Sequence, residues 1–165
     1  MKKISIIVAV AENNAIGRDN DLLCHLSEDL KRFKKLTTGN FVVMGKRTFE
    51  SLPRRPLPNR ENMVLTDIKD EKIEGCIMAY SIDDAVEKMS NELENFIIGG
   101  GSVYSQFLPI ANRLYLTKIH ASFNADTFFP EIDFSQWNVL EKEDVEKTEN
   151  DDYSYTYYIL ERKNL

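Results

Sequence analysis

Short, almost unbroken apolar runs alternate along this chain with segments in which apolar residues recur every three or four positions. The apolar runs, rich in β-branched residues, cover residues 4–10, 41–44, 62–66, 76–80, 96–98 and 114–119. Such runs are typical of strands buried on both faces, as in a parallel sheet. Helical patterns cover residues 27–36, 81–89 and 102–108, and a short helix is expected directly after residue 44. The alternation predicts an α/β fold with a mostly parallel sheet.

The boundaries of these elements carry their own signals. Ser27 is expected to cap the helix over residues 27–36, and Ser81, with Asp84 three residues later, approaches a capping box. Residues 153–160 are aromatic and β-branched with no helix after them. They predict an antiparallel edge strand, in a hairpin with residues 139–145. No linker or repeat divides the sequence, so one domain over residues 1–165 is expected.

Charge and cysteine content narrow the function classes. The net charge of −6 weighs against nucleic acid, but basic residues gather in residues 31–35 and 46–60, which favours a small anionic ligand near the first half of the chain. The two cysteines, Cys24 and Cys76, form no CxxC pair, and no metal site is expected. The apolar run at residues 4–11 is too short to span a bilayer and has no signal-peptide layout, so a cytoplasmic protein without membrane attachment is predicted.

One carboxylate stands out on the first predicted helix. On a helical wheel, Leu30, Phe33 and Leu36 share the apolar face, and Asp29 lies at the edge of that face. One interpretation is a first-turn acid that favours the helix dipole and points to water. The other is a lone carboxylate in an apolar pocket, where desolvation favours pairing with a ligand that carries adjacent N–H donors.

Two glycine turns each lie between the end of a predicted strand and the start of a predicted helix. Gly45-Lys46-Arg47-Thr48 combines cations and a hydroxyl at a helix start, as a phosphate site would, although surface charge at a helix start is the alternative. Gly99-Gly100-Gly101-Ser102 is either a nucleotide-binding turn or merely a tight turn. The spacing rules out a Walker A loop, and Tyr104 replaces the last glycine of a dinucleotide-binding fingerprint.

A proline-rich loop provides a fourth group of residues with a chemical role. Arg55, Leu57 and Arg60 lie among Pro53, Pro56 and Pro58. Arginines beside a leucine on a stiff loop suit a ligand with an apolar body and a carboxylate end.

These groups occur in an order that resembles the dihydrofolate reductase family along nearly the whole chain. The segments that carry the resemblance are residues 15–17, 29–34, 43–51, 55–60, 97–101, 114–117 and 126–130. The resemblance implies a central eight-stranded, mostly parallel sheet with an antiparallel C-terminal strand and helices on both faces.

The resemblance also implies an activity, NADPH-dependent reduction of dihydrofolate, and assigns roles to residues. Asp29 would bind the 2-amino group and ring N–H of the pterin, Thr117 would support Asp29 through its hydroxyl, and Arg60 would bind the glutamate α-carboxylate. The main-chain carbonyls of Ile7 and Ile98 would face the pterin and nicotinamide. The expected substrate-binding residues are Ile7, Val8, Leu30, Phe33, Ser51, Leu52, Arg55, Leu57, Arg60, Ile98 and Tyr104.

The implied cofactor is NADPH, with its phosphates on Lys46, Arg47 and Thr48 and its pyrophosphate facing the turn at residues 99–102, where a cis peptide between Gly99 and Gly100 is expected. The loop at residues 16–24, with Gly17 as its hinge, would close over the site. The expected cofactor-binding residues are Ala9, Ile16, Gly17, Asn20, Leu22, Gly45, Lys46, Arg47, Thr48, Leu65, Thr66, Gly99, Gly100, Gly101, Ser102, Val103, Tyr104 and Thr127. Antifolate inhibitors are further expected ligands, and a monomer is expected.

Two positions depart from the family pattern. Leu23 and Cys24 stand where most members have Pro-Trp, which implies that the water near the pterin is held differently and that Cys24 lies near the site. Asp67 stands near the expected place of the cofactor 2′-phosphate, which it would repel. Two alternatives remain: a pyrimidine reductase of riboflavin synthesis with the same fold, and a nucleotide-binding module without catalysis.

Overall fold

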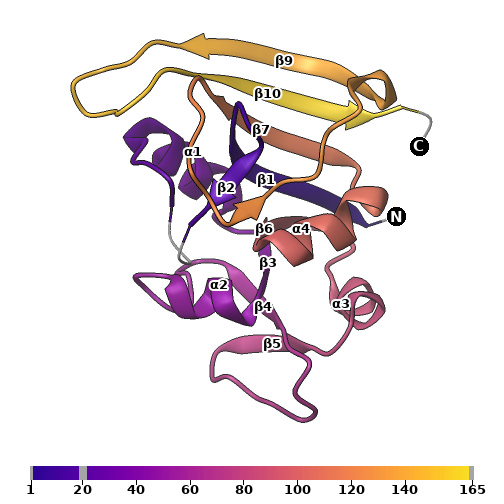
Figure 1. The fold of residues 1–165 in the computed structure, drawn as a ribbon. Coiled ribbons are helices and arrows are strands. Elements are labelled where there is room, and N and C mark those ends of the chain that lie inside the picture. The colour runs from indigo at the N-terminus through magenta and orange to yellow at the C-terminus, as the bar shows by residue number, and fades with distance from the viewer. Residues whose placement is uncertain (1, 19–21, 164–165) are drawn as a thin grey trace.

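One sheet organises the molecule. A computed structural model of the chain describes residues 2–18 and 22–163. The strands run in the order β5-β4-β3-β6-β1-β7-β10-β9, from β9 at the top of Figure 1 to β5 at the bottom. Their bounds are β1 (Lys3–Ala11), β3 (Phe41–Gly45), β4 (Glu61–Leu65), β5 (Cys76–Ala79), β6 (Glu94–Gly99), β7 (Arg113–Ile119), β9 (Trp137–Val145) and β10 (Tyr155–Arg162). The strands from β5 to β7 pair in parallel and β10 is antiparallel to both of its neighbours, so the predicted fold class is confirmed.

The helices cover both faces of this sheet. Their bounds are α1 (Ser27–Thr37), α2 (Lys46–Ser51), α3 (Ile82–Lys88) and α4 (Gly101–Phe107), with 3-10 turns η1 (Leu108–Ile110) and η2 (Phe134–Gln136). Alternate residues of β1 reach opposite layers: Ile6 packs in a cluster with Ala85 of α3 and Phe107 of α4. Ile7 packs on the other face against a cluster that includes Phe49 of α2. Burial on both faces explains why β1 reads as an unbroken apolar run.

The edge strand differs from the prediction. Residues 155–162 form β10, but β10 lies between β7 and β9, so β9 is the edge. The hairpin partner was predicted correctly; its place in the sheet was not. The aromatic character of β10 reflects burial between two neighbours. β9 is exposed along most of its length and carries charged residues, which is typical of strands that discourage further pairing.

The start of α1 also differs from the prediction. Leu26 occupies the N-cap position without a side-chain cap, and Ser27 is the first helical residue. The backbone N–H and Oγ of Ser27 both donate to Oδ1 of Asp151, at 2.6 and 2.9 Å. The acceptor therefore comes from the loop between β9 and β10, far along the chain. At α3 the expected cap is present, because Oγ of Ser81 accepts from the N–H of Asp84 at 3.0 Å.

A second, two-stranded sheet was not predicted. It joins β2 (Ala15–Gly17) to β8 (Thr127–Phe128). The N–H of Phe129 donates to the carbonyl of Asn14 at 2.8 Å, which continues this contact. The strands are too short to show a periodic pattern. Within residues 2–18 and 22–163, no helix is long and apolar enough to cross a membrane.

Candidate active site

Asp29 lies in the first turn of α1, against β7. Its Oδ1 accepts a hydrogen bond of 2.6 Å from Oγ1 of Thr117, a buried residue of β7. Burial raises the pKa of the Asp29 carboxyl, while the hydrogen bond from Thr117 and the charge of Arg32 act in the opposite direction. Of the two interpretations of Asp29, the structure favours the partly desolvated carboxylate over the one that points to water.

Asp151 holds the start of α1, two residues before Asp29, and sequence reasoning missed it. It is 3% exposed, and it accepts both hydrogen bonds from Ser27 described above. The neighbouring Asp152 accepts a hydrogen bond of 3.0 Å from the N–H of His25. Two adjacent acids of the β9–β10 loop therefore hold the segment that leads into Asp29. An acid at a helix start is favourable because it meets free N–H groups there.

The pairing of β1 with β6 ends just where ligand-facing carbonyls were expected. The register of the two strands stops at Ile6 and Ile97, although β6 continues to Gly99. The hydroxyl of Tyr104, on α4, donates to the carbonyl of Ile7 at 2.9 Å. A carbonyl has two lone pairs, so the hydrogen bond from Tyr104 occupies one of the two acceptor positions of this oxygen. Ligands of α/β proteins commonly bind where neighbouring strands separate at their carboxyl ends.

The two glycine turns lie against each other. A Cβ on Gly100 would come within 3.3 Å of Oγ1 of Thr48, and one on Gly45 within 3.2 Å of Val103. A Cβ on Gly101 would be only 2.7 Å from Cγ2 of Thr127, so no larger residue fits there without a shift. The Gly99–Gly100 peptide is cis. The starts of α2 and α4 thus form one surface of close backbone and hydroxyl groups, which fits a dinucleotide phosphate.

Lys46, at the start of α2, has an internal partner. Its Nζ lies 2.6 Å from Oε2 of Glu71, and Oε1 of Glu71 accepts a hydrogen bond of 2.5 Å from Oγ1 of Thr66. The hydrogen bond from Lys46, and then that from Thr66, lowers the pKa of Glu71. Sequence reasoning missed Glu71, which lies in an irregular acidic loop after β4.

The arginine loop is held by side chains around it. Arg60 donates through Nε to the carbonyl of Pro58 at 2.9 Å and through NH1 to Oγ1 of Thr37 at 3.1 Å. Asn62, buried at the start of β4, both donates to and accepts from the backbone of Leu57, each at 2.9 Å. Asn62 was not singled out from the sequence; a polar residue inside an apolar strand run was the available signal. Arg55 is exposed and donates to the carbonyl of Glu50.

The other predicted site residues lie in several different surroundings. Leu52, Leu57 and Ile98 pack on the α1 and α2 side of the sheet, whereas the side chain of Val8 lies in the core under α3 and α4. Ile16 and Leu65 pack against that same core, Ala9 packs near Leu26, and Phe33 is partly buried. Exposed members are Leu22, Leu30, Arg47, Ser51 and Ser102. Gly17 belongs to β2, and Asn20 lies outside the described residues.

Comparison with known proteins agrees with this arrangement. A family model described as dihydrofolate reductase matches residues 3–162. The chain belongs to the dihydrofolate reductase family. It is 45% identical to the dihydrofolate reductase of Bacillus subtilis (strain 168), over 98% of this chain and 95% of that protein. It is 43% identical to the type 3 dihydrofolate reductase of Salmonella typhimurium, over 97% and 98%. A solved structure of Enterococcus faecalis dihydrofolate reductase, complexed with NADP(H) and RAB-propyl, matches with a TM-score of 0.89 and 36% identity, covering 98% of this chain and 97% of that one.

The two departures from the dihydrofolate reductase pattern take definite places. Cys24 is half-buried and packs against the cluster around Leu26. Burial raises the pKa of its thiol to about 11, and the charges of Asp152, Asp29 and Asp151 add to the effect. The thiol is therefore neutral at pH 7 and near enough to Asp29 to be affected by its charge. Asp67 is exposed, and its charge contributes to the raised pKa of Lys46.

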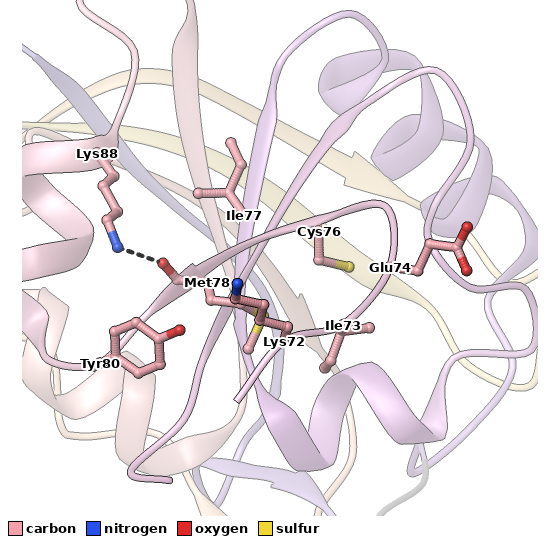
Figure 2. Close-up of a pocket in the computed structure, with 8 residues that line it drawn as sticks. All are labelled: Lys72, Ile73, Glu74, Cys76, Ile77, Met78, Tyr80 and Lys88. Carbon is pink, nitrogen blue, oxygen red and sulfur yellow. Dashed lines mark hydrogen bonds between the residues drawn. The ribbon is translucent and has the colours of Figure 1, made fainter. Parts of the chain in front are cut away.

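The structure also has a hollow beside β5, away from the predicted site residues. Figure 2 shows it beside β5, with Cys76, Met78 and Tyr80 among its lining residues and Lys88 donating to the carbonyl of Met78 at 2.8 Å. None of the predicted site residues lines it. Lys88 satisfies an edge carbonyl of the sheet, which is a structural role. In the part of the chain that the structure describes, no group of three or more His, Cys, Asp or Glu side chains could hold a metal ion.

Proposed function

We propose that this protein reduces 7,8-dihydrofolate to 5,6,7,8-tetrahydrofolate with NADPH. The observation that carries the proposal is the Asp29–Thr117 pair, a partly desolvated carboxylate fixed by a hydroxyl of the sheet. Such a carboxylate suits a ligand that offers two adjacent N–H donors, as the 2-amino group and ring nitrogen of a pterin do. Family membership supports the same substrate.

The reaction adds a hydride to C6 and a proton to N5, which reduces the C6=N5 bond. NADPH supplies the hydride when bound, and the protein's contribution is alignment and electrostatics. The Asp29 carboxylate orients the pterin by accepting hydrogen bonds from the N–H groups of the ring. Its negative charge also favours a protonated ring over a neutral one. Water delivers the proton to N5. Thr117 acts as a positioning residue, because its hydroxyl holds the Asp29 carboxylate in one orientation.

We propose the remaining substrate and cofactor contacts from the family's roles together with the contacts described above. Arg60, held by Pro58 and Thr37, binds the glutamate carboxylate of the substrate. Gly45, Thr48 and the turn at residues 99–102 hold the cofactor pyrophosphate, which their close packing supports. Lys46 and Arg47 bind the remaining phosphate charge. We also propose one domain, a monomer, a cytoplasmic location, and antifolates as competing ligands.

The test is an absorbance assay that follows the loss of reduced nicotinamide. Purified protein is mixed with NADPH, with and without dihydrofolate, beside an Asp29→Asn variant. We expect oxidation that requires dihydrofolate and falls by about 100-fold or more in the variant, because the variant loses the charge that favours protonation of the substrate. No oxidation by the wild-type protein would overturn the proposed function, and full activity of the variant would overturn the role of Asp29.

A further inference from the structure

The two carboxylate oxygens of Glu71 are contacted by two different side chains, both of which are expected to bind the cofactor. Lys46, from the start of α2, contacts Oε2 at 2.6 Å, and Thr66, from the end of β4, contacts Oε1 at 2.5 Å. An ammonium and a hydroxyl that donate to one anion form the kind of site that binds a phosphate oxygen. In this chain the anion between them belongs to the protein itself.

The loop that carries Glu71 holds it in this position. The hydroxyl of Tyr80, just beyond β5, donates to the carbonyl of Glu71 at 2.8 Å. The N–H of Glu71 donates to the carbonyl of Ile68, and the N–H of Ile68 donates to Oγ1 of Thr66 at 3.1 Å. Thr66 therefore bonds to both ends of a tight turn. Glu71 therefore lies in a turn closed by its own hydrogen bonds, and Thr66 holds its carboxylate at the oxygen that Lys46 does not contact.

Charge around Lys46 is negative on several sides. The hydrogen bond to Glu71 raises the pKa of Lys46, and the charges of Glu71, Glu50 and Asp67 add to the effect. Both members of the pair are therefore ionised at neutral pH. A ligand phosphate that approaches Lys46 meets an ammonium whose charge is already balanced, together with two further carboxylates.

From this geometry we infer that Glu71 is an internal competitor of the cofactor phosphate, and that NADPH must displace it from Lys46 and Thr66. The inference rests on the proposed function, in which Lys46 binds cofactor phosphate, and on the family resemblance, which also assigns Thr66 to the cofactor. The relevant phosphate is the 2′-phosphate, because Asp67, next to Thr66, occupies the position expected beside that group. NADH lacks this phosphate and need not displace Glu71. Glu71 thus lowers the preference of the enzyme for NADPH over NADH.

The experiment measures binding rather than turnover. Calorimetric titration of the whole protein with NADPH, and separately with NADH, is done for the wild type and for Glu71→Gln. We expect the variant to bind NADPH about fivefold more tightly, within the range of a partly exposed ion pair, and to bind NADH within about twofold of the wild type. The gain in NADPH affinity should shrink in high salt, which screens exposed charges.

Two further variants make the result specific. Asp84→Asn removes a carboxylate paired with Lys88 at 2.9 Å on α3, and it should change neither affinity. In a Lys46→Gln background, Glu71→Gln should give a clearly smaller gain for NADPH, because only the contact with Thr66 remains to compete for. Thermal melts of each variant confirm that the protein tested is folded.

Each other outcome has a definite meaning. Weaker NADPH binding by Glu71→Gln would show that Glu71 orients Lys46 for the phosphate, and unchanged binding would show no competition; either overturns the inference. An equal gain for NADH overturns it too, since the effect would not depend on the phosphate. Binding with the expected ratio but no reduction of dihydrofolate would leave the inference standing and overturn the proposed function. Failure to bind either nucleotide would overturn both.

Discussion

Asp29, on α1, and Glu71, in the loop after β4, show how the same functional group takes opposite roles at two places beside one sheet. At α1, burial raises the pKa of the Asp29 carboxyl, and the hydrogen bond from the hydroxyl of Thr117 only partly offsets this. After β4, Glu71 has a cation and a hydroxyl, so its pKa is lowered. A carboxylate whose acceptors are met inside the protein has little to offer a ligand. In the proposed function Asp29 accepts hydrogen bonds from the substrate, and in the further inference Glu71 competes with an anion.

The largest expected effect is on turnover. Asp29→Asn should lower kcat/KM for dihydrofolate by about 100-fold or more at pH 7, because the amide cannot stabilise a protonated pterin. The equivalent change, Glu71→Gln, should act on the apparent KM for NADPH. Steady-state assays that vary each substrate separately distinguish the two. A loss of less than about threefold for Asp29→Asn would remove the contrast.

The second effect is on the free energy of unfolding. It concerns Asp151, a carboxylate that, like Glu71, accepts hydrogen bonds from donors of the protein itself. Asp151→Ala removes both acceptor contacts to Ser27 at the start of α1, and should lower the free energy of unfolding by about 1–2 kcal/mol. Asp133→Ala is the matched control, because Asp133 accepts the same pair of hydrogen bonds from Ser135 on an exposed turn. Its cost should stay below about 0.5 kcal/mol. Urea unfolding measures both, and equal losses would contradict a special role for the buried cap.

The third effect is on the pH dependence of stability, and it has opposite signs at Asp29 and Glu71. The raised pKa of Asp29 means that the folded state binds its proton more tightly, so stability falls as pH rises through this pKa. Asp29→Asn should therefore be more stable than the wild type at pH 7, by about 1 kcal/mol or about 2–4 °C in Tm, and should lose this advantage in acid.

At Glu71 the pKa is lowered in the folded protein, so the ionised carboxylate stabilises the fold when the pH is above the ordinary pKa of a glutamate. This stability is lost as the pH falls through the pKa of Glu71 in the folded protein. Glu71→Gln should therefore have a slightly lower Tm than the wild type at pH 7 and a similar Tm in acid. Thermal melts from pH 3 to pH 8 test both variants. Shifts of the same sign at pH 7 would show that the two carboxylates do not differ in this way.

The smallest effect concerns the partner of Asp29. The hydrogen bond from Thr117 lowers the pKa of Asp29, so Thr117→Val should raise it further. The acid limb of the pH profile of kcat/KM should therefore move to higher pH. Thr117→Ser keeps the hydroxyl and should restore the wild-type profile. An unshifted profile in Thr117→Val would show that this hydrogen bond does not tune the carboxylate.

The parallel strands and helices of the central sheet could be predicted because their signal is local. β1 is buried on both faces and reads as an apolar run, and the cap of α3 by Ser81 lies within four residues. The place of β10 could not be predicted this way. An aromatic strand is compatible with an edge or an interior position, and only the pairing partners decide between them.

The sequence alone determined the α/β class, the carboxylate at the edge of an apolar helix face, and the two glycine turns, because periodicity and backbone freedom are properties of neighbouring residues. Only the tertiary structure decided which groups meet. It brought Asp151 to the start of α1, Thr117 to Asp29, and Glu71 between Lys46 and Thr66. The partners of Asp29 and of the α1 start come from 88 and 124 positions away along the chain. Charge balance and desolvation depend on distance in space, so the role of each carboxylate appears only after the chain has folded.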